Sequence, residues 1–434
     1  MREMKDSGVE WIGKIPKDWE IVPLTKQLDS IVDYRGKTPE KTEEGIFLVT
    51  AKNIKDGKIC YELSKEYVRE ADYEEIMHRG IPQIGDILFT TEAPLGQVAN
   101  VDRTDIALAQ RIIKFRALST VNNYYLKYWM LNEGFQQFLH SLSTGSTATG
   151  IKSSKLFLLP LVRPNIEQQN KIVEYLDAKC SKIDEIVEKQ KVIIEKLEEY
   201  KLSIITEAVI KGLNPDVEMK NSGYEYIGDI PNYWNVCRLR NYGSAQNGIS
   251  KGGEYFGTGF PFVSYGDVYR NYALPNRVDG LINTTEEERK KYSVEEGDIF
   301  FTRTSETIEE VGFSAVCNKT IPNATYAGFV IRVRPFIDML TLGFAKYYFR
   351  SKHLRVYFAK EMNLVTRASL GQDLLKSMPL LVPPKDEQCK IAEYLDKKCT
   401  LIDSNIYEKG RLIIKLQEYK KSLIYEVVTG KKEV

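Results

Sequence analysis

The sequence lacks the long apolar runs that membrane-spanning and secreted proteins carry. No stretch of its 434 residues approaches about 18 consecutive hydrophobic residues, and no apolar segment at the N-terminus precedes a small-residue cleavage site. We therefore expect neither a membrane span nor a secretory signal, and we expect the protein to be cytoplasmic.

Residues that bind metals are also scarce. Histidine occurs three times, and the six cysteines form no Cys-x-x-Cys pair, so the sequence predicts no structural metal site. Cys180 and Cys399 fall on apolar helical stripes, where cysteine serves as a small buried hydrophobic residue. Reduced thiols in a cytoplasm fit this pattern best.

Catalytic motifs are missing as well. The sequence contains no G-x-x-x-x-G-K-[ST] phosphate loop, no H-E-x-x-H and no G-x-S-x-G. Pro215–Lys220 has the letters of a nuclease motif, but only Val217 separates its two acids, so we interpret it as a linker. Tyr255–Gly259 loosely resembles a glycine turn for a nucleotide, yet it lacks the preceding parallel strand, and we interpret it as a loop. We expect a non-catalytic chain that binds no cofactor itself.

A net charge of one sign is absent too. The 61 Lys and Arg residues nearly balance the 60 Asp and Glu residues, which leaves a formal net charge of +1. The bulk positive charge that usually marks a nucleic-acid-binding protein is therefore missing. Any binding of nucleic acid must come from local groups of side chains.

What the sequence does contain is an internal repeat. Lys5–Trp19 returns as Lys220–Trp234, and Lys171–Cys180 returns as Lys390–Cys399 with eight of ten residues identical. A period of more than about 200 residues is far too long for a solenoid, whose units span a few tens of residues. We infer duplication of a whole domain with a connecting element, and we expect a pseudo-two-fold axis between the halves.

Each half begins with a section of alternating strand and turn signals. Short apolar runs such as Gly85–Phe89 and Gly297–Phe301 are separated by Gly, Pro, Asn and Asp. Helical patterns over 124–141 and near 344–360 interrupt them, and a further apolar strand is expected over 156–162. The sequence predicts an α+β fold with similar globular α/β domains at 1–164 and 213–384, joined by long helices at 165–212 and 385–434.

The two long helices carry matching apolar seams. Apolar residues recur in alternating steps of four and three, interrupted at matching positions by Gln190 and Lys409 and by Lys201 and Lys420. A helix of about 40 residues with one apolar seam is not stable alone in water, so we expect the copies to pair as an antiparallel coiled coil. The seam is expected at Leu176, Cys180, Ile183, Val187, Ile194, Leu197, Leu395, Cys399, Ile402, Ile406, Ile413 and Leu416.

Two motifs that occur in both halves carry a family resemblance: Pro164–Asp184 with its counterpart Pro383–Asp403, and the Ser-Gly-x-Glu-aromatic-Ile-Gly-x-Ile-Pro opening of each half. Together they resemble the specificity (S) subunit of type I restriction-modification systems. The resemblance implies two target-recognition domains that each read one half of a bipartite DNA target. It also implies a coiled coil that sets the spacer and binds two methyltransferase subunits, which restriction subunits join. S-adenosylmethionine, ATP and magnesium would then belong to those partners. A coiled-coil adaptor that binds only proteins stays open as an alternative.

Polar loops at the predicted strand ends are candidates for contacts with double-stranded DNA. Arg and Lys suit guanine, Asn and Gln suit adenine, and other polar groups hold phosphates. A single loop of this kind is more often only solvated surface, but we expect several of them to touch DNA. The candidates are Arg35, Lys37, Lys52, Asn53, Gln110, Arg111, Ser143, Thr144, Ser146, Lys251, Ser264, Tyr265, Arg303, Thr304 and Arg367.

Overall fold

The computed structural model describes residues 2–34, 39–145, 149–305, 311–361 and 368–434. The chain forms two compact units of mixed α/β structure. The first unit comprises Met1–Lys191 and Gly410–Val434, and the second comprises Val192–Lys409. Each unit thus includes part of both long helices, whereas the sequence boundaries set the helices apart from the globular sections.

Among its described residues, the globular section of the first unit contains short strands, three α-helices and short 3-10 helices. In chain order the strands and α-helices are β1 (Met4–Asp6), β2 (Lys14–Pro16), β3 (Glu20–Pro23), β4 (Leu28–Asp33), β5 (Ile46–Val49), β6 (Ile54–Lys55), β7 (Lys58–Ile59), β8 (Tyr67–Val68), α1 (Tyr73–Met77), β9 (Ile87–Thr90), β10 (Val98–Asn100), β11 (Ile106–Leu108), β12 (Ile112–Ala117), α2 (Asn123–Leu131), α3 (Glu133–Ser141) and β13 (Pro160–Arg163).

Two sheets form the centre of this unit. The four-stranded antiparallel sheet has the order β10-β9-β12-β4, and the three-stranded sheet has the order β11-β5-β8, with β11 and β5 parallel. Ile87 and Phe89 of β9 face the core shared with α2, α3 and the long helices, whereas Leu88 faces the core shared with the three-stranded sheet. Burial on both faces explains the continuous apolar run in this strand.

The second unit repeats this topology with its own elements. They are β14 (Met219–Asn221), β15 (Asp229–Pro231), β16 (Asn235–Arg238), β17 (Gly243–Asn247), β18 (Phe256–Val263), α5 (Tyr265–Arg270), β19 (Leu281–Ile282), α6 (Glu286–Lys291), β20 (Ile299–Thr302), β21 (Thr304–Ser305), β22 (Ser314–Val316), β23 (Thr325–Tyr326), β24 (Val330–Pro335), α7 (Leu342–Tyr348), α8 (Lys352–Glu361), β25 (Ala368–Ser369), α9 (Gln372–Ser377) and β26 (Pro379–Val382). Its larger sheet has the order β22-β20-β24-β17, and β18 pairs parallel with β23 and antiparallel with β19.

The Gly-Asp-Ile motif shared by both halves places a buried carboxylate at the start of a central strand. In the first unit Asp86 is 1% exposed and accepts hydrogen bonds from Arg116 (2.8 Å) and Lys114 (3.2 Å). Burial opposes ionisation of Asp86 and would raise its pKa. Three influences outweigh burial: these two side-chain hydrogen bonds, a third hydrogen bond from the backbone amide of Gln83, and the positive charge of Lys114. They hold the pKa of Asp86 below its usual range. Asp298 pairs in the same way with Arg334 (2.6 Å) in the second unit.

Two helices that the sequence predicts as continuous are broken. The pattern over 124–141 forms α2 and α3, because Asn132 has an extended backbone and its side chain accepts a hydrogen bond from the amide of Phe135 (2.9 Å). The pattern near 344–360 forms α7 and α8, and the Ser351 hydroxyl donates to the last turn of α7 (2.5 Å). Polar side chains that bond to the local backbone interrupt the helix without disturbing the apolar period.

Two segments have a secondary structure different from the one that the sequence predicts. Tyr255–Gly259, interpreted as a loop, mostly belongs to strand β18, whose register with β19 shifts in this region. Gly257 there has a φ of 95°, so the irregular strand accounts for a glycine that resembled part of a nucleotide site. The strand expected over 156–162 starts later, at β13, because Ser153–Leu158 form a 3-10 helix.

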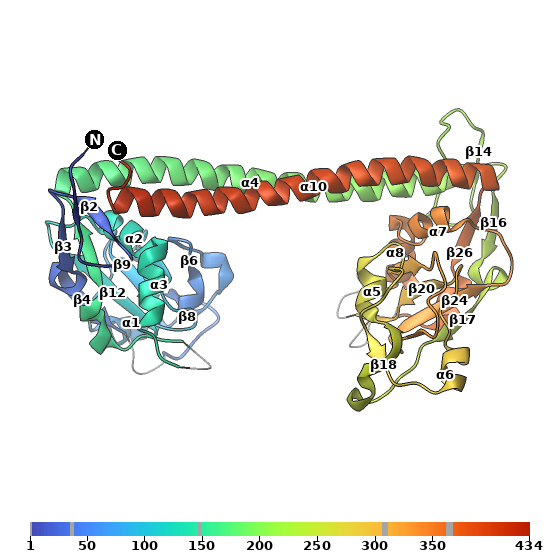
Figure 1. Ribbon diagram of the computed structural model, residues 1–434, viewed down its shortest axis with the longest axis horizontal. Helices are drawn as coiled ribbons and strands as arrows, with labels where there is room; N and C mark the ends of the chain where they lie inside the picture. The colour runs from blue at the N-terminus through green and yellow to red at the C-terminus, as the bar shows by residue number, and fades with distance from the viewer. Residues whose placement is uncertain (1, 35–38, 146–148, 306–310, 362–367) are drawn as a thin grey trace. The chain divides into compact units, whose positions relative to one another are not determined.

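The two long helices are α4 (Ile166–Lys211) and α10 (Lys385–Val428). In the first unit, the N-terminal part of α4 lies beside the C-terminal part of α10; in the second unit, the C-terminal part of α4 lies beside the N-terminal part of α10 (Figure 1). Helix α10 ends before the predicted boundary at Val434, because the left-handed Gly430 terminates it (φ 71°).

Side-chain pairs show that the helices run antiparallel in the first unit. Lys420 of α10 lies 2.5 Å from Asp184 of α4. Lys432, which follows α10, lies over the ring of Tyr175 near the start of α4, 5.8 Å from its centroid. The later residue of one helix therefore meets the earlier residue of the other.

The second unit shows the same direction. Lys201 of α4 lies 2.7 Å from Asp403 of α10. Gly212, directly after α4, lies close to Glu387 in the first turn of α10: a Cβ atom on Gly212 would be 2.6 Å from a carboxylate oxygen of Glu387. The polar interruption that the sequence placed at Lys201 therefore has an acidic partner on the facing helix. A polar pair at a seam position favours one register over alternatives.

All the predicted seam residues are buried or half-buried. Cys180 is 5% exposed and Cys399 is 4% exposed, and burial raises the pKa of the Cys180 thiol to about 11. Tyr200 (51% exposed) and Tyr407 (65% exposed) are two large side chains that lie off the seam and face away from it. The a/d pattern predicts burial of this kind along one side of each helix.

A glutamine at the start of each long helix ties it to the globular section. Gln169 is 0% exposed; its amide donates to the carbonyls of Thr120 (3.1 Å) and Pro164 (2.8 Å) and accepts from the amide of Asn122 (2.8 Å). Gln388 makes three equivalent bonds in the second unit. The Gln of each repeated motif thus satisfies three backbone groups that would otherwise be buried without partners.

We expect Asp86→Asn to destabilise the protein, because it removes the negative charge that balances Lys114 and Arg116. Breaking a buried ion pair by removing one partner costs about 3–5 kcal/mol. Since the pKa of Asp86 is lower in the folded state, its contribution is present above the unfolded pKa of about 3.9 and is lost as the pH falls through the folded value. Thermal unfolding of the full chain from pH 7 to pH 3 measures both effects.

The matched control is Asp105→Asn. Asp105 pairs with Arg103 at the surface and its side chain is 68% exposed, so this variant should change stability little. Equal unfolding temperatures for the two variants at pH 7 would contradict the importance of the buried carboxylate.

Candidate DNA interface

Strand ends bring several candidate residues together in the first unit. β4 ends at Asp33, β9 ends at Thr90 and β12 begins at Ile112, and the register places these positions side by side. The adjoining segments therefore share one edge of the sheet. We define the first loop edge as residues 33–34, 91–92, 110–111, 143–144 and 150–151.

Backbone hydrogen bonds hold the first loop edge together. The amide and the hydroxyl of Thr91 both donate to the carbonyl of Arg111 (2.9 and 3.2 Å). Gly150 forms bridges with both Glu92 and Thr144. The structure thus brings together four candidates from distant segments: Gln110, Arg111, Ser143 and Thr144. Of these, Ser143 donates its hydroxyl to the last turn of α3 (2.6 Å) and Thr144 is exposed.

Arg111 combines a strained backbone with an exposed side chain. Its φ of 76° lies in the left-handed region, which costs an L-residue about 1–2 kcal/mol. The guanidinium Nε lies 2.9 Å from a carboxylate oxygen of Glu92, and the two side chains are 48% and 39% exposed. An ion pair this exposed contributes little to stability, so it does not offset the strain.

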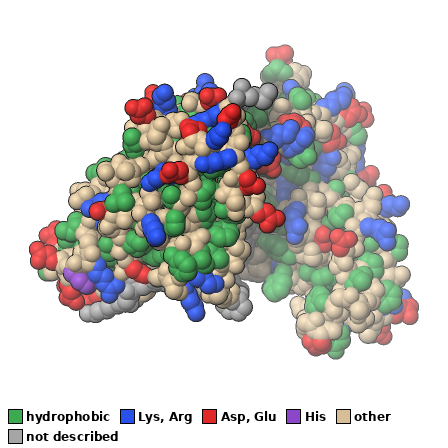
Figure 2. Space-filling model, turned by 60° about the vertical axis from the view of Figure 1, so that its left-hand side comes forward, with side chains coloured by type: hydrophobic (Ala, Val, Ile, Leu, Met, Phe, Trp, Pro, Cys, Tyr) green, Lys and Arg blue, Asp and Glu red, His purple; other side chains and the backbone are tan. Residues whose placement is uncertain are grey.

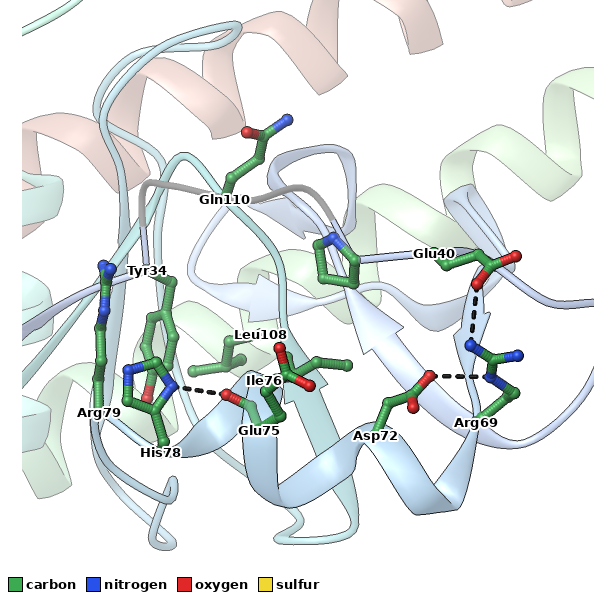
Figure 3. A pocket seen from close by; sticks show the side chains of 11 residues that line it. Tyr34, Glu40, Arg69, Asp72, Glu75, Ile76, His78, Arg79, Leu108 and Gln110 are labelled. Carbon is green, nitrogen blue, oxygen red and sulfur yellow. Dashed lines mark hydrogen bonds and ion pairs between the residues drawn. The ribbon is translucent and has the colours of Figure 1, made fainter.

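A cavity of about 380 Å³ opens beside the first loop edge (Figure 3). Tyr34, Ile76 and Leu108 supply its apolar surface, and Gln110 lies above them at the rim. Arg69 on the opposite side is held by two carboxylates, each at 2.9 Å. The charge of Arg69 is therefore already neutralised.

Asn53 is a structural residue, which corrects its prediction as a DNA contact. Its side chain is 0% exposed and accepts a hydrogen bond from the amide of Thr50 (2.9 Å). The same side chain donates to the carbonyls of Cys60 (3.0 Å) and Ser64 (2.9 Å), so it fixes the turn after β5. Lys52 beside it is exposed and keeps the geometry expected of a surface contact.

The second unit has a corresponding loop edge. β17 ends at Asn247, β20 ends at Thr302 and β24 begins at Val330, and the register again makes them neighbours. We define the second loop edge as residues 248–251, 264–265, 303–304 and 328–329. It contains five candidates: Lys251, Ser264, Tyr265, Arg303 and Thr304.

Arg303 and Phe329 occupy the centre of the second loop edge. The Arg303 amide donates to the carbonyl of Phe329 (2.9 Å), the same bond that Thr91 makes to Arg111. Phe329 therefore corresponds to Arg111, and it is 63% exposed. Arg303 is half-buried, and Thr304 lies in strand β21, paired with β25.

Lys251 and Ser264 make structural contacts. The Lys251 ammonium group donates to Glu288 (2.7 Å) and to the carbonyl of Asn283 (3.0 Å), and its side chain is 14% exposed. The Ser264 hydroxyl caps α5 and donates to Asp267 (2.7 Å). These groups therefore help to hold the loop edge in shape, and their contacts with DNA stay a prediction.

Tyr265 begins a row of aromatic rings that the sequence did not reveal. It stacks on Tyr269 at 5.9 Å, and Tyr269 lies 5.2 Å from Phe313. The buried Arg350 guanidinium lies 4.9 Å from the Phe313 centroid and donates to backbone carbonyls. Burial lowers the pKa of Arg350 to about 10, yet it stays charged near neutrality. No sequence pattern marks this cluster.

Four candidates lie outside the described residues: Arg35, Lys37, Ser146 and Arg367. Glu92 and Phe329 are two loop-edge residues that the sequence reasoning missed. Both follow from aligning the two Gly-Asp-Ile strands and the strands beside them, so the repeat itself carried the signal.

The described residues do not assemble a catalytic or metal centre at the partial motifs. Within Pro215–Lys220, Glu218 accepts from Asn232 (2.8 Å) and Lys220 donates to the carbonyl of Trp234 (2.7 Å), so their side chains do not converge. Among the described residues, no group of three or more His, Cys, Asp or Glu could hold a metal ion.

The surface matches the balanced composition. On the face shown in Figure 2, Lys and Arg side chains are interspersed with Asp and Glu side chains. In the part of the chain that the structure describes, no helix is long and apolar enough to cross a membrane.

Comparison with known proteins identifies the family. The model of the type I restriction modification DNA specificity domain matches residues 16–199 and 234–416. The chain belongs to this family. Both matches include a loop edge and part of a long helix, so the family's repeated domain corresponds to the duplication seen in the sequence.

Characterised relatives cover most of the chain. The Type I restriction enzyme EcoKI specificity subunit of Escherichia coli K12 is 22% identical over 440 residues, which span 96% of this chain and 90% of the relative. The Type I restriction enzyme MjaIX specificity subunit of Methanocaldococcus jannaschii is 26% identical over 319 residues and 70% of each chain.

Solved structures share the fold. A chain from a structure of a type I R-M system, solved for its complex assembly and conformational transition, has a TM-score of 0.72 at 17% identity and covers 95% of this chain and 98% of its own length. The HsdS subunit of Thermoanaerobacter tengcongensis has a TM-score of 0.51 at 17% identity, with 96% and 98% covered. The two-domain fold with long helices is thereby confirmed.

We expect Asn53→Ala to destabilise the protein and Lys52→Ala to leave its stability almost unchanged. Asn53→Ala leaves three backbone groups without partners and should cost about 1–3 kcal/mol for each group that stays buried. Lys52→Ala removes an exposed side chain and should change stability by less than about 0.5 kcal/mol. Thermal unfolding of the full chain measures both. Equal stabilities would show that the Asn53 bonds are replaced by water.

Proposed function

We propose that each unit of this specificity subunit reads one half of a bipartite sequence in double-stranded DNA through its loop edge. One observation carries the proposal: two units of the same topology present matching loop edges whose exposed side chains differ. Arg111 in the first corresponds to Phe329 in the second. Different side chains on one scaffold suit two half-sites of different sequence.

We also propose that the coiled coil sets the spacer and docks two methyltransferase subunits, which restriction subunits join. The continuous helices α4 and α10 and their antiparallel pairing within each unit support this role. A helix pair of this length is stiff enough to act as a ruler, whereas a flexible linker is not. Exposed side chains such as Tyr407 offer contact surface to a partner.

The proposed division of labour leaves the chemistry to the partners. S-adenosylmethionine, ATP and magnesium would be bound by the methyltransferase and restriction subunits, and this chain would supply the DNA address in the cytoplasm. The absence of catalytic motifs from the sequence supports this assignment.

The first test is the salt dependence of DNA binding by the complex of this chain with its methyltransferase subunits. Phosphate contacts release counterions, so log K should fall linearly with log salt, by about 0.9 for each phosphate neutralised. Footprinting should show two protected stretches about one helical turn apart. The methyltransferase subunits alone are the control. A salt-independent association with proteins only would support an adaptor instead.

The second test changes the length of the ruler. Inserting one seven-residue repeat into each of α4 and α10 at facing positions preserves the seam and adds about 10 Å of helix. The preferred spacer should grow by about three base pairs, at about 3.4 Å each. Methylation of a series of duplexes with different spacers measures it.

The control for that insertion replaces an existing seven-residue repeat by the inserted sequence without changing the length. This variant should keep the original spacer. An unchanged spacer in the lengthened protein would refute the ruler, while leaving DNA reading by the two units intact.

A further inference from the structure

We propose that Arg111 is a base-reading residue of the first unit and that it recognises a guanine in the half-site which this unit contacts. This inference rests on the proposed function and assigns one of its contacts to a single side chain. It begins from the backbone, because Arg111 adopts a conformation (φ 76°) that favours glycine. A residue held there against its preference is a marker of function when its surroundings fix it.

The surroundings of Arg111 fix its backbone from two sides. Its carbonyl accepts two hydrogen bonds from Thr91, at 2.9 and 3.2 Å. The next residue, Ile112, is paired with Thr90 inside the sheet. Gly150 packs against this segment so closely that a Cβ atom there would lie 3.3 Å from the Thr91 carbonyl oxygen. The position of the backbone from which the Arg111 side chain projects is therefore set by the core of the unit.

The side chain is oriented as well. Glu92 lies 2.9 Å from Nε, which leaves the outer edge of the guanidinium with its two terminal nitrogens. In the part of the chain that the structure describes, those two nitrogens donate no hydrogen bond. Two parallel N–H donors on a planar group match the O6 and N7 acceptors of guanine in the major groove. Pre-orientation by Glu92 lowers the entropy that the long side chain would lose on binding.

The position in the second unit that corresponds to Arg111 holds a side chain of different chemistry. Phe329 accepts the equivalent backbone bond but brings no hydrogen-bonding side chain. Guanine recognition at this position is thus a property of the first unit alone, and a substitution of Arg111 should alter one half-site only.

The experiment measures base preference in the assembled complex with its methyltransferase subunits. Methylation of a duplex library with both half-sites randomised, at one salt concentration, gives the base requirement at each position. In Arg111→Lys the charge stays but the paired donors are lost. Discrimination for guanine at one position of one half-site should fall by about 5- to 150-fold, and the other half-site should be unaffected.

Arg111→Gly separates reading from folding. Glycine relieves the strained φ, so the unfolding temperature should equal or exceed that of the wild type, while guanine discrimination falls as in Arg111→Lys. Arg103→Ala is the matched control, since Arg103 is 47% exposed and also pairs with a carboxylate, but precedes β11 instead of following it. Its profile should match the wild type.

Glu92 acts as a positioning residue in this scheme. Glu92→Gln keeps an oxygen that can accept from Nε and should retain the preference, whereas Glu92→Ala should weaken it. Loss of affinity for all sequences alike in Arg111→Lys would overturn the proposal in favour of a phosphate contact, and an unchanged base profile would overturn it outright. A wild-type complex without any base requirement would instead refute the proposed function itself.

Discussion

Burial of one apolar seam between α4 and α10 is the constraint on which the rest of the structure depends. Neither helix, of 46 and 44 residues, has enough propensity to stand alone in water with its seam exposed. Because the helices pair antiparallel, the last turns of α10 complete the core of the first unit, where Leu423 and Val427 are buried with Ile172. The duplicated halves of the sequence are therefore not the two folded units, since each unit takes helix segments from both halves.

The same constraint explains which residues recur in the repeat and which do not. Gln169 and Gln388 satisfy buried backbone groups, and Lys201 and Lys420 face acidic partners across the seam. A change at Gln169 or Gln388 leaves buried backbone groups without a partner, and a change at Lys201 or Lys420 leaves a carboxylate on the facing helix without its cation. Both copies therefore need the same residue type. Arg111 and Phe329 lie outside the cores, where the scaffold needs only their backbone groups. The loop edges were thus free to diverge while the scaffold stayed the same.

Local patterns in the sequence sufficed for the central strands and the places where candidate loops begin, because burial imposes a period on neighbouring residues. They could not show that the helix breaks at Asn132, that Asn53 is buried or that Lys251 is paired with Glu288. Those outcomes depend on hydrogen-bond partners whose position follows from tertiary structure. Arg111 is an intermediate case. Its place at a strand end was predictable, but its left-handed backbone was not, because an arginine in the sequence does not indicate that conformation.

A nearly neutral chain suits a protein that must select a sequence rather than simply hold DNA. Non-specific affinity comes mostly from phosphate contacts and rises with positive charge, so a net charge of +1 keeps that background low. Discrimination between bases then depends on a few oriented side chains. For these side chains, a fixed backbone position matters more than the number of contacts. The fixed backbone of Arg111 meets this requirement, since a mobile arginine would bind phosphate and base edges alike.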